Sequence, residues 1–401
     1  MRGDAMRIVI AGASGFVGQM LVPELRARGA DVMLLGRDPE TLQAKFPECA
    51  VSDYANLSQA LQGADLLLNL AVVNSDAGAS LSAYQAVNVE FAATLAQAAQ
   101  DAGGRFINVS STHALEAANR SAYAQSKRDG VAAVDAVGGD IVHLYLPAIY
   151  GATFAGALRH LNRLPKPLAR FAFGPISALK PTLSVTRLAE WLCHHARTAP
   201  RELVLSDGQG GNLTYRAISR VMDLAAAVGG LILFALPMLI LWALIRKEGD
   251  GPAIFAQPRV GRGGQVFTCY KFRTMAIGMR QAGTHEVSSA AVTPLGAKLR
   301  RYKLDELPQL WNVLWGDMSL IDPRPCLPAK EELVRLRGQA GVLHIRPGIS
   351  GLAQVAGVDM SDPARLVAWD ARYIALRGLI LDIRLILQTA LGAGQGDRVG
   401  K

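Results

Sequence analysis

Cysteine, aromatic residues and charge are all sparse in this chain of 401 residues, which is 6% aromatic and 19% charged. Its cysteines are Cys49, Cys193, Cys269 and Cys326, with no close pair among them. That spacing predicts neither a disulfide framework nor a zinc site, and it is typical of a reducing compartment. The first residues lack the apolar core of a signal peptide, so we expect no secretion signal there.

Long apolar runs are also scarce, which argues against a multi-span membrane protein. Leu224–Ile245 is the exception, with 22 residues and no charge. A straight helix of that length would extend about 33 Å, enough to cross a bilayer. However, Pro237 lies near its middle, and basic residues flank both ends. The run therefore favours a helix that enters the membrane, bends and returns to the same face, with a true span as the alternative.

An excess of positive charge is confined to the second half. Residues 1–213 hold 18 Lys+Arg and 18 Asp+Glu, so the whole net charge of +9 belongs to residues 214–401. Such asymmetry indicates an anionic partner for that half. The alternative is a merely solvated basic surface, which we disfavour because the apolar run lies in the same half. We expect phosphates and lipid headgroups as partners, and no nucleic acid.

A strand, a glycine turn and a helix open the chain. Arg7–Ala11 is β-branched, Gly12-Ala-Ser-Gly-Phe-Val-Gly18 follows, and a helical pattern continues to Gly29. In this context glycines let the backbone approach a pyrophosphate at a helix N-terminus. Further strand-like runs at 31–35, 66–70, 105–109 and 141–146 alternate with helical segments. The pattern predicts a parallel, doubly wound α/β sheet that binds a dinucleotide.

Serine, tyrosine and lysine provide a candidate set of proton-transfer groups. Ser111 ends one strand-like run, and Tyr123 and Lys127 lie four apart on the next helix, on one face. A neighbouring ammonium lowers the pKa of a phenol, which can then exchange a proton with a substrate oxygen while hydride moves. Arg37, after the second strand, favours a 2′-phosphate and hence NADP over NAD.

Residues 6–210 resemble the short-chain dehydrogenase/reductase superfamily, most closely its NAD-dependent epimerase/dehydratase group. The resemblance rests on these motifs together with Asn88 and Pro147-Ala-Ile-Tyr-Gly151. It implies a nucleotide-sugar substrate, catalysis by Ser111, Tyr123 and Lys127, and support of the active site by Asn88. The implied cofactor-binding residues are Gly12, Ser14, Gly15, Phe16, Val17, Gly18, Arg37, Asp53, Ala71, Lys127 and Pro147.

The most informative stretch is Arg300–Pro325, in which Asp305 and Glu306 lie between cationic residues. Pro308 is a good first helical residue, so we expect both carboxylates at a positive helix N-terminus. An ionised aspartate there can attack phosphorus, and its glutamate neighbour can hold Mg²⁺. Before this stretch, 294–303 predicts a basic amphipathic helix. In the chain before this helix, the sequence predicts a strand, a glycine turn and a second strand that carries Lys271 and Arg273.

Residues 214–395 resemble the bacterial sugar transferases, the monotopic phosphoglycosyl transferases. The motifs that carry this resemblance are Gln257-Pro-Arg-Val-Gly261, Lys271-Phe-Arg-Thr-Met275, Leu304–Leu314, Pro323-Arg-Pro325 and Arg346–Gln354. The family moves a sugar-1-phosphate from a UDP-sugar to a polyprenyl phosphate. The resemblance implies Asp305 as nucleophile, Glu306 as Mg²⁺ ligand, and phosphate binding by Arg300 and Arg324, with Lys271 and Arg273 as further substrate-binding candidates.

The sequence therefore predicts three parts: a Rossmann-like NAD(P)-binding domain at 1–212, a re-entrant membrane helix at 213–250 and a small, mainly helical transferase domain at 251–401. We expect a bifunctional enzyme on the cytoplasmic face of the bacterial inner membrane. Its expected partners are a UDP-sugar and undecaprenyl phosphate, and a homodimer stays open. The alternatives are a non-catalytic regulatory or oligomerisation module at the N-terminus, and a membrane-tethered dehydrogenase with an inert anchor. The sugar, the choice of reduction or epimerisation, and the order of the two steps stay undetermined.

Overall fold

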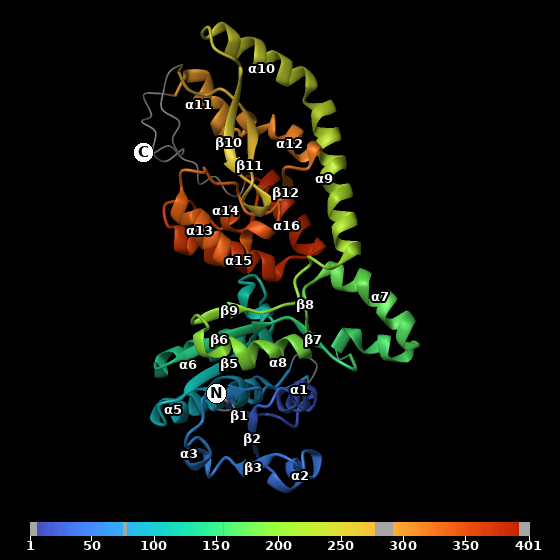
Figure 1. Ribbon diagram of the computed structural model, residues 1–401, viewed down its shortest axis with the longest axis vertical. Coiled ribbons are helices and arrows are strands. Elements are labelled where there is room, and N and C mark those ends of the chain that lie inside the picture. Colours follow the sequence, from blue (N-terminus) through green and yellow to red (C-terminus); the bar gives the residue numbers. More distant parts are fainter. Residues whose placement is uncertain (1–5, 75–77, 155, 277–291, 393–401) are drawn as a thin grey trace. The chain divides into compact units, whose positions relative to one another are not determined.

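The computed structural model describes residues 6–74, 78–154, 156–276 and 292–392. The chain forms two compact units (Figure 1). The first comprises Met1–Ser177 and Pro181–Gly208, and the second comprises Ala178–Lys180 and Gln209–Lys401.

A seven-stranded parallel sheet organises the first unit. In spatial order its strands are β3 (Ala50–Asp53), β2 (Asp31–Gly36), β1 (Arg7–Ala11), β4 (Leu66–Asn69), β5 (Arg105–Ser111), β6 (Ile141–Leu146) and β9 (Glu202–Val204). This confirms the predicted Rossmann-like architecture. The strand order reverses between β1 and β4, and ligands of such sheets bind beyond the carboxyl ends of the strands at this reversal.

Helices cover both faces of this sheet because its strands are apolar on both sides (Figure 1). Ile8 and Ile10 of β1 belong to one core, and Val9 and Ala11 to the other. Successive strand residues point to opposite faces, so the two cores lie on opposite sides. The first core includes α1 (Phe16–Ala27), α2 (Pro39–Lys45) and α8 (Val185–His194), and the second includes α3 (Leu57–Ala60), α5 (Ala92–Asp101) and α6 (Ala122–Val137).

Further helical segments and strands belong to this unit. They are α4 (Leu81–Tyr84), a π-helical segment (Gln85–Phe91), α7 (Lys166–Leu179, which ends in the second unit), β7 (Ala148–Tyr150) and β8 (Thr182–Ser184).

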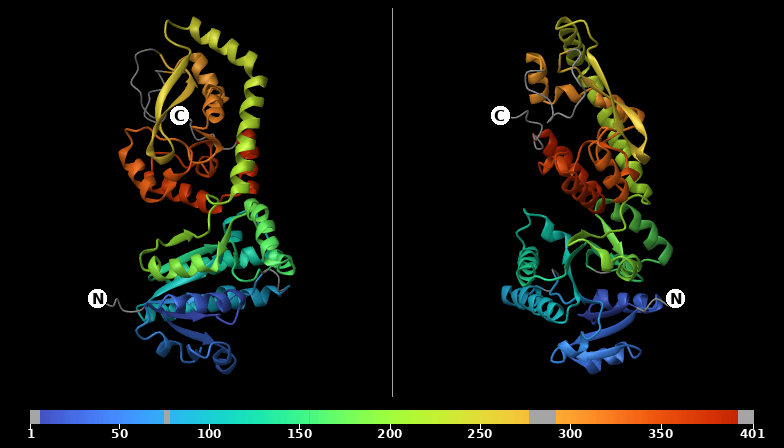
Figure 2. Two further views of the ribbon diagram at one scale, coloured as in Figure 1. Left: turned by 45° about the vertical axis from the view of Figure 1, so that its right-hand side comes forward. Right: turned by 60° about the vertical axis from the view of Figure 1, so that its left-hand side comes forward.

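The apolar run of the sequence forms two helices in the second unit. They are α9 (Leu213–Leu233) and α10 (Ala235–Lys247), bent by 62° (Figure 2). No single described helix is long and apolar enough to span a membrane, but this bent pair passes that test together. The two helices are separated at Phe234. The sequence predicted the kink at Pro237, three residues later. The reason is that proline removes the hydrogen bond to the carbonyl four residues earlier, which is that of Leu233.

The rest of the second unit packs small cores around an antiparallel hairpin of β10 (Ile254–Val260) and β11 (Val266–Phe272). The predicted strand, turn and strand are thus confirmed. The helices are α11 (Pro294–Arg301), α12 (Gln309–Trp315), α13 (Glu331–Gln339), α14 (Leu352–Val355), α15 (Pro363–Leu376) and α16 (Leu379–Ala390), and β12 (Ser319–Ile321) pairs with β13 (Gly348–Ser350).

Candidate active sites

The carboxylate pair lies in a 3₁₀ turn, Leu304–Glu306, just before α12. The sequence placed it at a helix opened by Pro308, and in the structure α12 begins one residue later, at Gln309. Lys303, directly before the turn, has a φ of 57°, in the left-handed region that non-glycine residues rarely adopt. Such local strain gathers at functional sites, where the surrounding structure enforces it.

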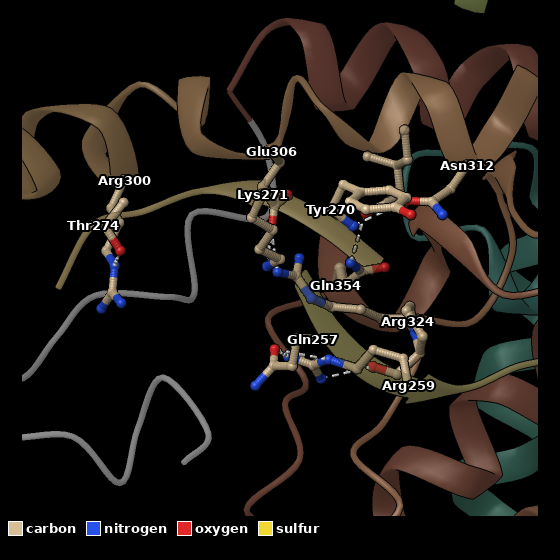
Figure 3. Close-up of polar contacts among 12 residues, drawn as sticks. Gln257, Arg259, Tyr270, Lys271, Thr274, Arg300, Glu306, Asn312, Arg324 and Gln354 are labelled. Atoms are coloured by element: carbon tan, nitrogen blue, oxygen red, sulfur yellow. Dashed lines mark hydrogen bonds and ion pairs between the residues drawn. The ribbon is translucent and has the colours of Figure 1, made fainter. Parts of the chain in front are cut away.

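Two cations from different elements meet on Glu306 (Figure 3). The Nζ of Lys271 on β11 lies 2.8 Å from Glu306 Oε1, and Arg324 donates to the same oxygen. Burial alone would raise the pKa of Glu306, but the charges of Arg324 and Lys271 outweigh it and hold this pKa well below its ordinary value. The two cations therefore favour the ionised form of Glu306.

Asp305 has the opposite electrostatic environment, although it is the neighbouring residue. Its side chain is buried, and burial together with the charge of Glu306 raises its pKa to about 6. The cations Lys271, Arg324 and Arg300 oppose that shift without cancelling it. We expected an aspartate kept ionised by a helix terminus. Burial and Glu306 raise its pKa instead of lowering it, but at about 6 this pKa still leaves the carboxylate mainly ionised at neutral pH.

The structure separates the four predicted substrate-binding cations. Lys271 and Arg324 bond Glu306 directly, and their charges act on Asp305. Arg300 donates from Nε to the hydroxyl of Thr274 at 2.9 Å (Figure 3). Its positive charge also lowers the pKa of Asp305. Arg273 is not brought to the pair, because its Nη2 donates to the carbonyl of Ile245 at 2.8 Å, near the end of α10.

Asn312 is a residue of this site that the sequence reasoning missed. It is fully buried on α12, where its Oδ1 accepts from Tyr270 N at 3.1 Å and its Nδ2 donates to Thr268 O at 2.7 Å. It thereby ties the helix after the carboxylates to the strand that carries Lys271. An amide side chain inside the apolar stretch Leu-Trp-Asn-Val-Leu is the signal that could have identified it.

The predicted Mg²⁺ fits this donor set only as an ion shared with a substrate. Among the described residues, no group of three His, Cys, Asp or Glu side chains is placed to hold a metal. Mg²⁺ is commonly bound by one or two carboxylates together with substrate phosphates, and Asp305 and Glu306 offer such a pair. Lys271 and Arg324 both bond Oε1 of Glu306, so Glu306 would hold the ion in addition to these two cations.

The bent helix pair exposes apolar side chains along both arms. The large ones that are more than two-fifths exposed are Leu213, Ile218, Val221, Val228, Ile232, Leu233, Leu236, Leu239, Ile240, Trp242 and Leu244. Trp311 and Trp315 on α12 are also exposed, and their ring centroids lie 5.8 Å apart. An exposed apolar surface of this extent is typical of a membrane or protein contact.

In the first unit, the glycine turn forms a cradle that a side chain would fill. Gly12 has a φ of 83°, and a Cβ there would lie 2.5 Å from the backbone nitrogen of Ala71, beyond the end of β4. A Cβ on Gly18 would lie 2.3 Å from the carbonyl oxygen of Ala13. Helix α1 begins at Phe16, so its N-terminal amides face the turn. This geometry fits the pyrophosphate of a dinucleotide.

The predicted proton-transfer residues come from neighbouring elements β5 and α6. Lys127 is buried, donates to the carbonyl of Val109 at 3.0 Å, and has its pKa lowered by burial to about 8. The hydroxyl of Ser111 lies 3.0 Å from Nδ1 of His113, a contact that the sequence reasoning did not foresee. The ring of Tyr123 packs edge-on against those of His113 and Tyr84.

The other predicted residues of this unit lie around the same edge of the sheet. Arg37 follows β2 and is exposed, and Asp53 ends β3, where its carboxylate accepts from Asn56. Asn88 is buried in the π-helical segment and bonds both the backbone of Val73 and the hydroxyl of Ser126 on α6. Asn88 therefore connects the loop after β4 to the helix of Tyr123 and Lys127.

Comparison with known families matches both halves of the chain. The model of the bacterial sugar transferase family matches residues 214–395, and that of the NAD dependent epimerase/dehydratase family matches residues 8–187. A UDP-glucose:undecaprenyl-phosphate glucose-1-phosphate transferase of Caulobacter vibrioides is 39% identical over 212 residues, covering 49% of this chain and 78% of that protein.

Two further relatives carry other sugars in their names. A UDP-N-acetylgalactosamine-undecaprenyl-phosphate N-acetylgalactosaminephosphotransferase of Aeromonas hydrophila is 39% identical over 196 residues, 46% of each chain. An undecaprenyl-phosphate galactose phosphotransferase of Salmonella typhimurium is 35% identical over 193 residues, 44% of this chain and 40% of that protein. The chain thus spans less than half the length of these two relatives.

Proposed function

This chain belongs to the bacterial sugar transferase family, with a domain of the NAD-dependent epimerase/dehydratase family fused before it, and we propose that it transfers a sugar-1-phosphate from a UDP-sugar to undecaprenyl phosphate. The observation that carries this proposal is the contrast between the electrostatic environments of the adjacent carboxylates Asp305 and Glu306. One carboxylate is buried and has a pKa close to neutrality, and its neighbour is neutralised by two cations.

In the proposed mechanism, a carboxylate oxygen of Asp305 attacks the phosphorus that carries the sugar. A new O–P bond forms, the bond from that phosphorus to the oxygen of UMP breaks, and UMP leaves with the electron pair. An oxygen of undecaprenyl phosphate then attacks the same phosphorus. The acyl phosphate bond breaks, Asp305 is released as a carboxylate, and the sugar is left on a lipid diphosphate.

The surrounding cations have distinct tasks in this mechanism. Arg324 and Lys271 would stabilise the charge on the diphosphate, and their ion pairs with Glu306 keep that carboxylate ionised. Arg300 supports the ionised form of Asp305 from beside Thr274. Bound Mg²⁺, held through Glu306 and the substrate, would neutralise the charge on departing UMP.

The proposed activity is tested by product release from the detergent-solubilised full-length protein. We expect UMP to appear from at least one of UDP-glucose, UDP-galactose and UDP-N-acetylgalactosamine when both Mg²⁺ and undecaprenyl phosphate are supplied. Omitting either should reduce sustained release to background, since the second step needs the acceptor. Absence of UMP with every sugar would contradict the transferase proposal and favour the inert anchor.

The raised pKa of Asp305 predicts an acid limit to this reaction. Its pKa lies near 6 instead of the ordinary 3.8, so the attacking carboxylate is lost as the pH falls through about 6. We expect kcat/KM to decline about tenfold for each pH unit below that value. A high concentration of Mg²⁺ should shift this acid-side decline to lower pH, because a nearby cation favours the ionised carboxylate. A flat profile from neutral pH well into the acid range, in protein that stays folded, would contradict the assigned environment.

We further propose that α9 and α10 enter the cytoplasmic leaflet, bend at Phe234 and return to the same face. The bend of 62° and the exposed apolar side chains support this placement. Both catalytic halves would then share one compartment with UDP-sugar and nicotinamide cofactor. The basic net charge of residues 214–401 suits the anionic surface of that leaflet.

For the first unit we propose reduction or epimerisation of the sugar with NADP or NAD. Tyr123 would exchange a proton with a sugar oxygen, Ser111 would hold that oxygen, and Lys127 would bind the cofactor ribose and act on the phenol. The glycine cradle and the carbonyl-bound Lys127 support this proposal. The bound nicotinamide would supply or accept the hydride.

Tyr123→Phe separates this proposal from a regulatory module. The phenylalanine keeps the ring but removes the proton donor, so we expect conversion of the sugar to fall by roughly 10²- to 10⁴-fold. Mass spectrometry of the lipid-linked product, with and without NADPH, is the measurement. UMP release should stay unchanged. Identical sugar products from the variant and the unsubstituted protein would favour a non-catalytic first unit.

A further inference from the structure

The segment Pro323–Cys326, which carries Arg324, has four consecutive carbonyls that each accept a hydrogen bond. The outer two bond backbone amides: Pro323 O accepts from Gly348 at 2.9 Å, and Cys326 O accepts from Val260 at 2.9 Å. The inner two bond arginine side chains instead. Arg337 Nη1 donates to Arg324 O at 2.8 Å, and Arg259 Nη1 donates to Pro325 O at 3.0 Å.

Each of these two arginines is itself fixed by a buried partner on its own or a neighbouring element. Arg337 on α13 is 3% exposed, and its Nε donates to Oδ2 of Asp370 on α15 at 3.0 Å. Arg259 on β10 bonds Oε1 of the buried Gln257 through Nε at 3.1 Å and through Nη2 at 2.7 Å. The two guanidinium groups therefore hold the segment from two separate parts of the unit.

The two prolines of the segment explain why hydrogen bonds to its carbonyls anchor it. Pro323 and Pro325 have no N–H, so the segment is anchored chiefly through its acceptors. Burying a guanidinium is unfavourable unless it is fully paired, and a backbone amide would satisfy a carbonyl at lower cost. The two arginines are found only at the carbonyls of Arg324 and its successor within this segment, next to the side chain that reaches Glu306.

The positive charge of Arg259 also acts on the side chain of Arg324. Burial lowers the pKa of Arg259, and the charge of Arg324 lowers it further, which shows that the two guanidinium groups act on each other. Like charges repel, so Arg259 favours orientations of the Arg324 guanidinium away from its own, and Arg324 pairs with Glu306 (Figure 3).

We propose that Arg259 and Arg337 are positioning residues that direct the guanidinium of Arg324 onto the carboxylate pair, and that they affect sugar-phosphate transfer only through Arg324. This inference rests on the proposed transferase function. It concerns the geometry of the phosphate-binding arginine and not a direct contact of either residue with substrate.

A double-mutant cycle tests the proposal. Arg259→Lys keeps the positive charge but cannot bond Gln257 and Pro325 together, and Arg324→Gln removes the positioned group. We expect Arg259→Lys to lower kcat/KM for UMP release about tenfold alone and less than about twofold in the Arg324→Gln background. Equal losses in both backgrounds, or no loss from Arg259→Lys alone, would overturn the proposal.

A second cycle combines Arg337→Lys with Arg324→Gln and tests the arginine that bonds the carbonyl of Arg324. Arg335→Lys is its matched control. Arg335 lies on the same helix, is exposed and bonds Gln339, so its variant should keep full activity. If Arg337→Lys does not fold, as judged by thermal melting, the Arg259 cycle alone decides. If the unsubstituted protein releases no UMP, the transferase proposal fails, and the affinity for UDP measured by calorimetry replaces kcat/KM in the same cycle.

Discussion

Asp305→Asn is expected to abolish release of UMP, with a loss of at least about 10⁴-fold in kcat, as is usual when a covalent nucleophile is removed. The amide is nearly the same size as the carboxylate, so it keeps the packing of a buried position. It has no charge to attack phosphorus. Removing a carboxylate whose pKa is raised by burial also relieves an unfavourable charge, so the variant should be at least as stable as the unsubstituted protein.

Two measurements make this prediction specific. Phosphorus incorporation from a UDP-sugar labelled at its β-phosphate should mark the unsubstituted protein and not the Asp305→Asn variant. Asp250→Asn, which changes an exposed carboxylate shortly after α10, is the matched control and should release UMP normally. A rate for Asp305→Asn within about tenfold of the unsubstituted protein would assign the nucleophile to another group.

Glu306→Gln is expected to lower both activity and stability, because two cations then lose their shared counter-ion. Breaking a buried ion pair by removing one partner costs about 3–5 kcal/mol, and the partial exposure of Lys271 and Arg324 places this case near or below the lower figure. We expect a lower melting temperature and a loss in kcat/KM of roughly 10²- to 10³-fold, since phosphate binding by Arg324 and the site for Mg²⁺ are both disturbed.

A compensating variant separates the two effects of Glu306→Gln. Lys271→Met together with Glu306→Gln removes one unpaired cation, so the melting temperature should recover in part while activity stays low. Glu331→Gln, which changes an exposed carboxylate at the start of α13, should alter neither property. Full activity of Glu306→Gln with saturating Mg²⁺ would contradict the role of this residue in metal binding.

The bend in the apolar run illustrates what local sequence predicts well and what it does not. Pro237 correctly indicated a break because proline removes a backbone donor wherever it stands. The position of the break, Phe234, depends on which carbonyl loses its partner, and this is a property of the formed helix.

The cations of β11 illustrate a limit of strand periodicity. Lys271 and Arg273 are two residues apart, so alternation in a continuing strand would put both on one face. The strand ends at Phe272, and Arg273 beyond it turns to the carbonyl of Ile245. Only Lys271 of these two therefore reaches Glu306, and the second cation there, Arg324, comes from a segment 53 residues further along the chain.

By itself, the sequence determined the alternation of strands and helices in the first unit, the glycine turn after its first strand and the resemblance of each half to a family, because these depend on local periodicity and on motifs contiguous in the chain. The short strands β3 and β9 were not among the predicted runs. Only the tertiary structure decided how the electrostatic environments of the two adjacent carboxylates differ, because the sequence does not show which of them the distant cations contact. Asp305 and Glu306 are direct neighbours in the chain. Their pKa values diverge because Lys271 and Arg324, distant in sequence, converge on Glu306 within a buried region where charge is weakly screened.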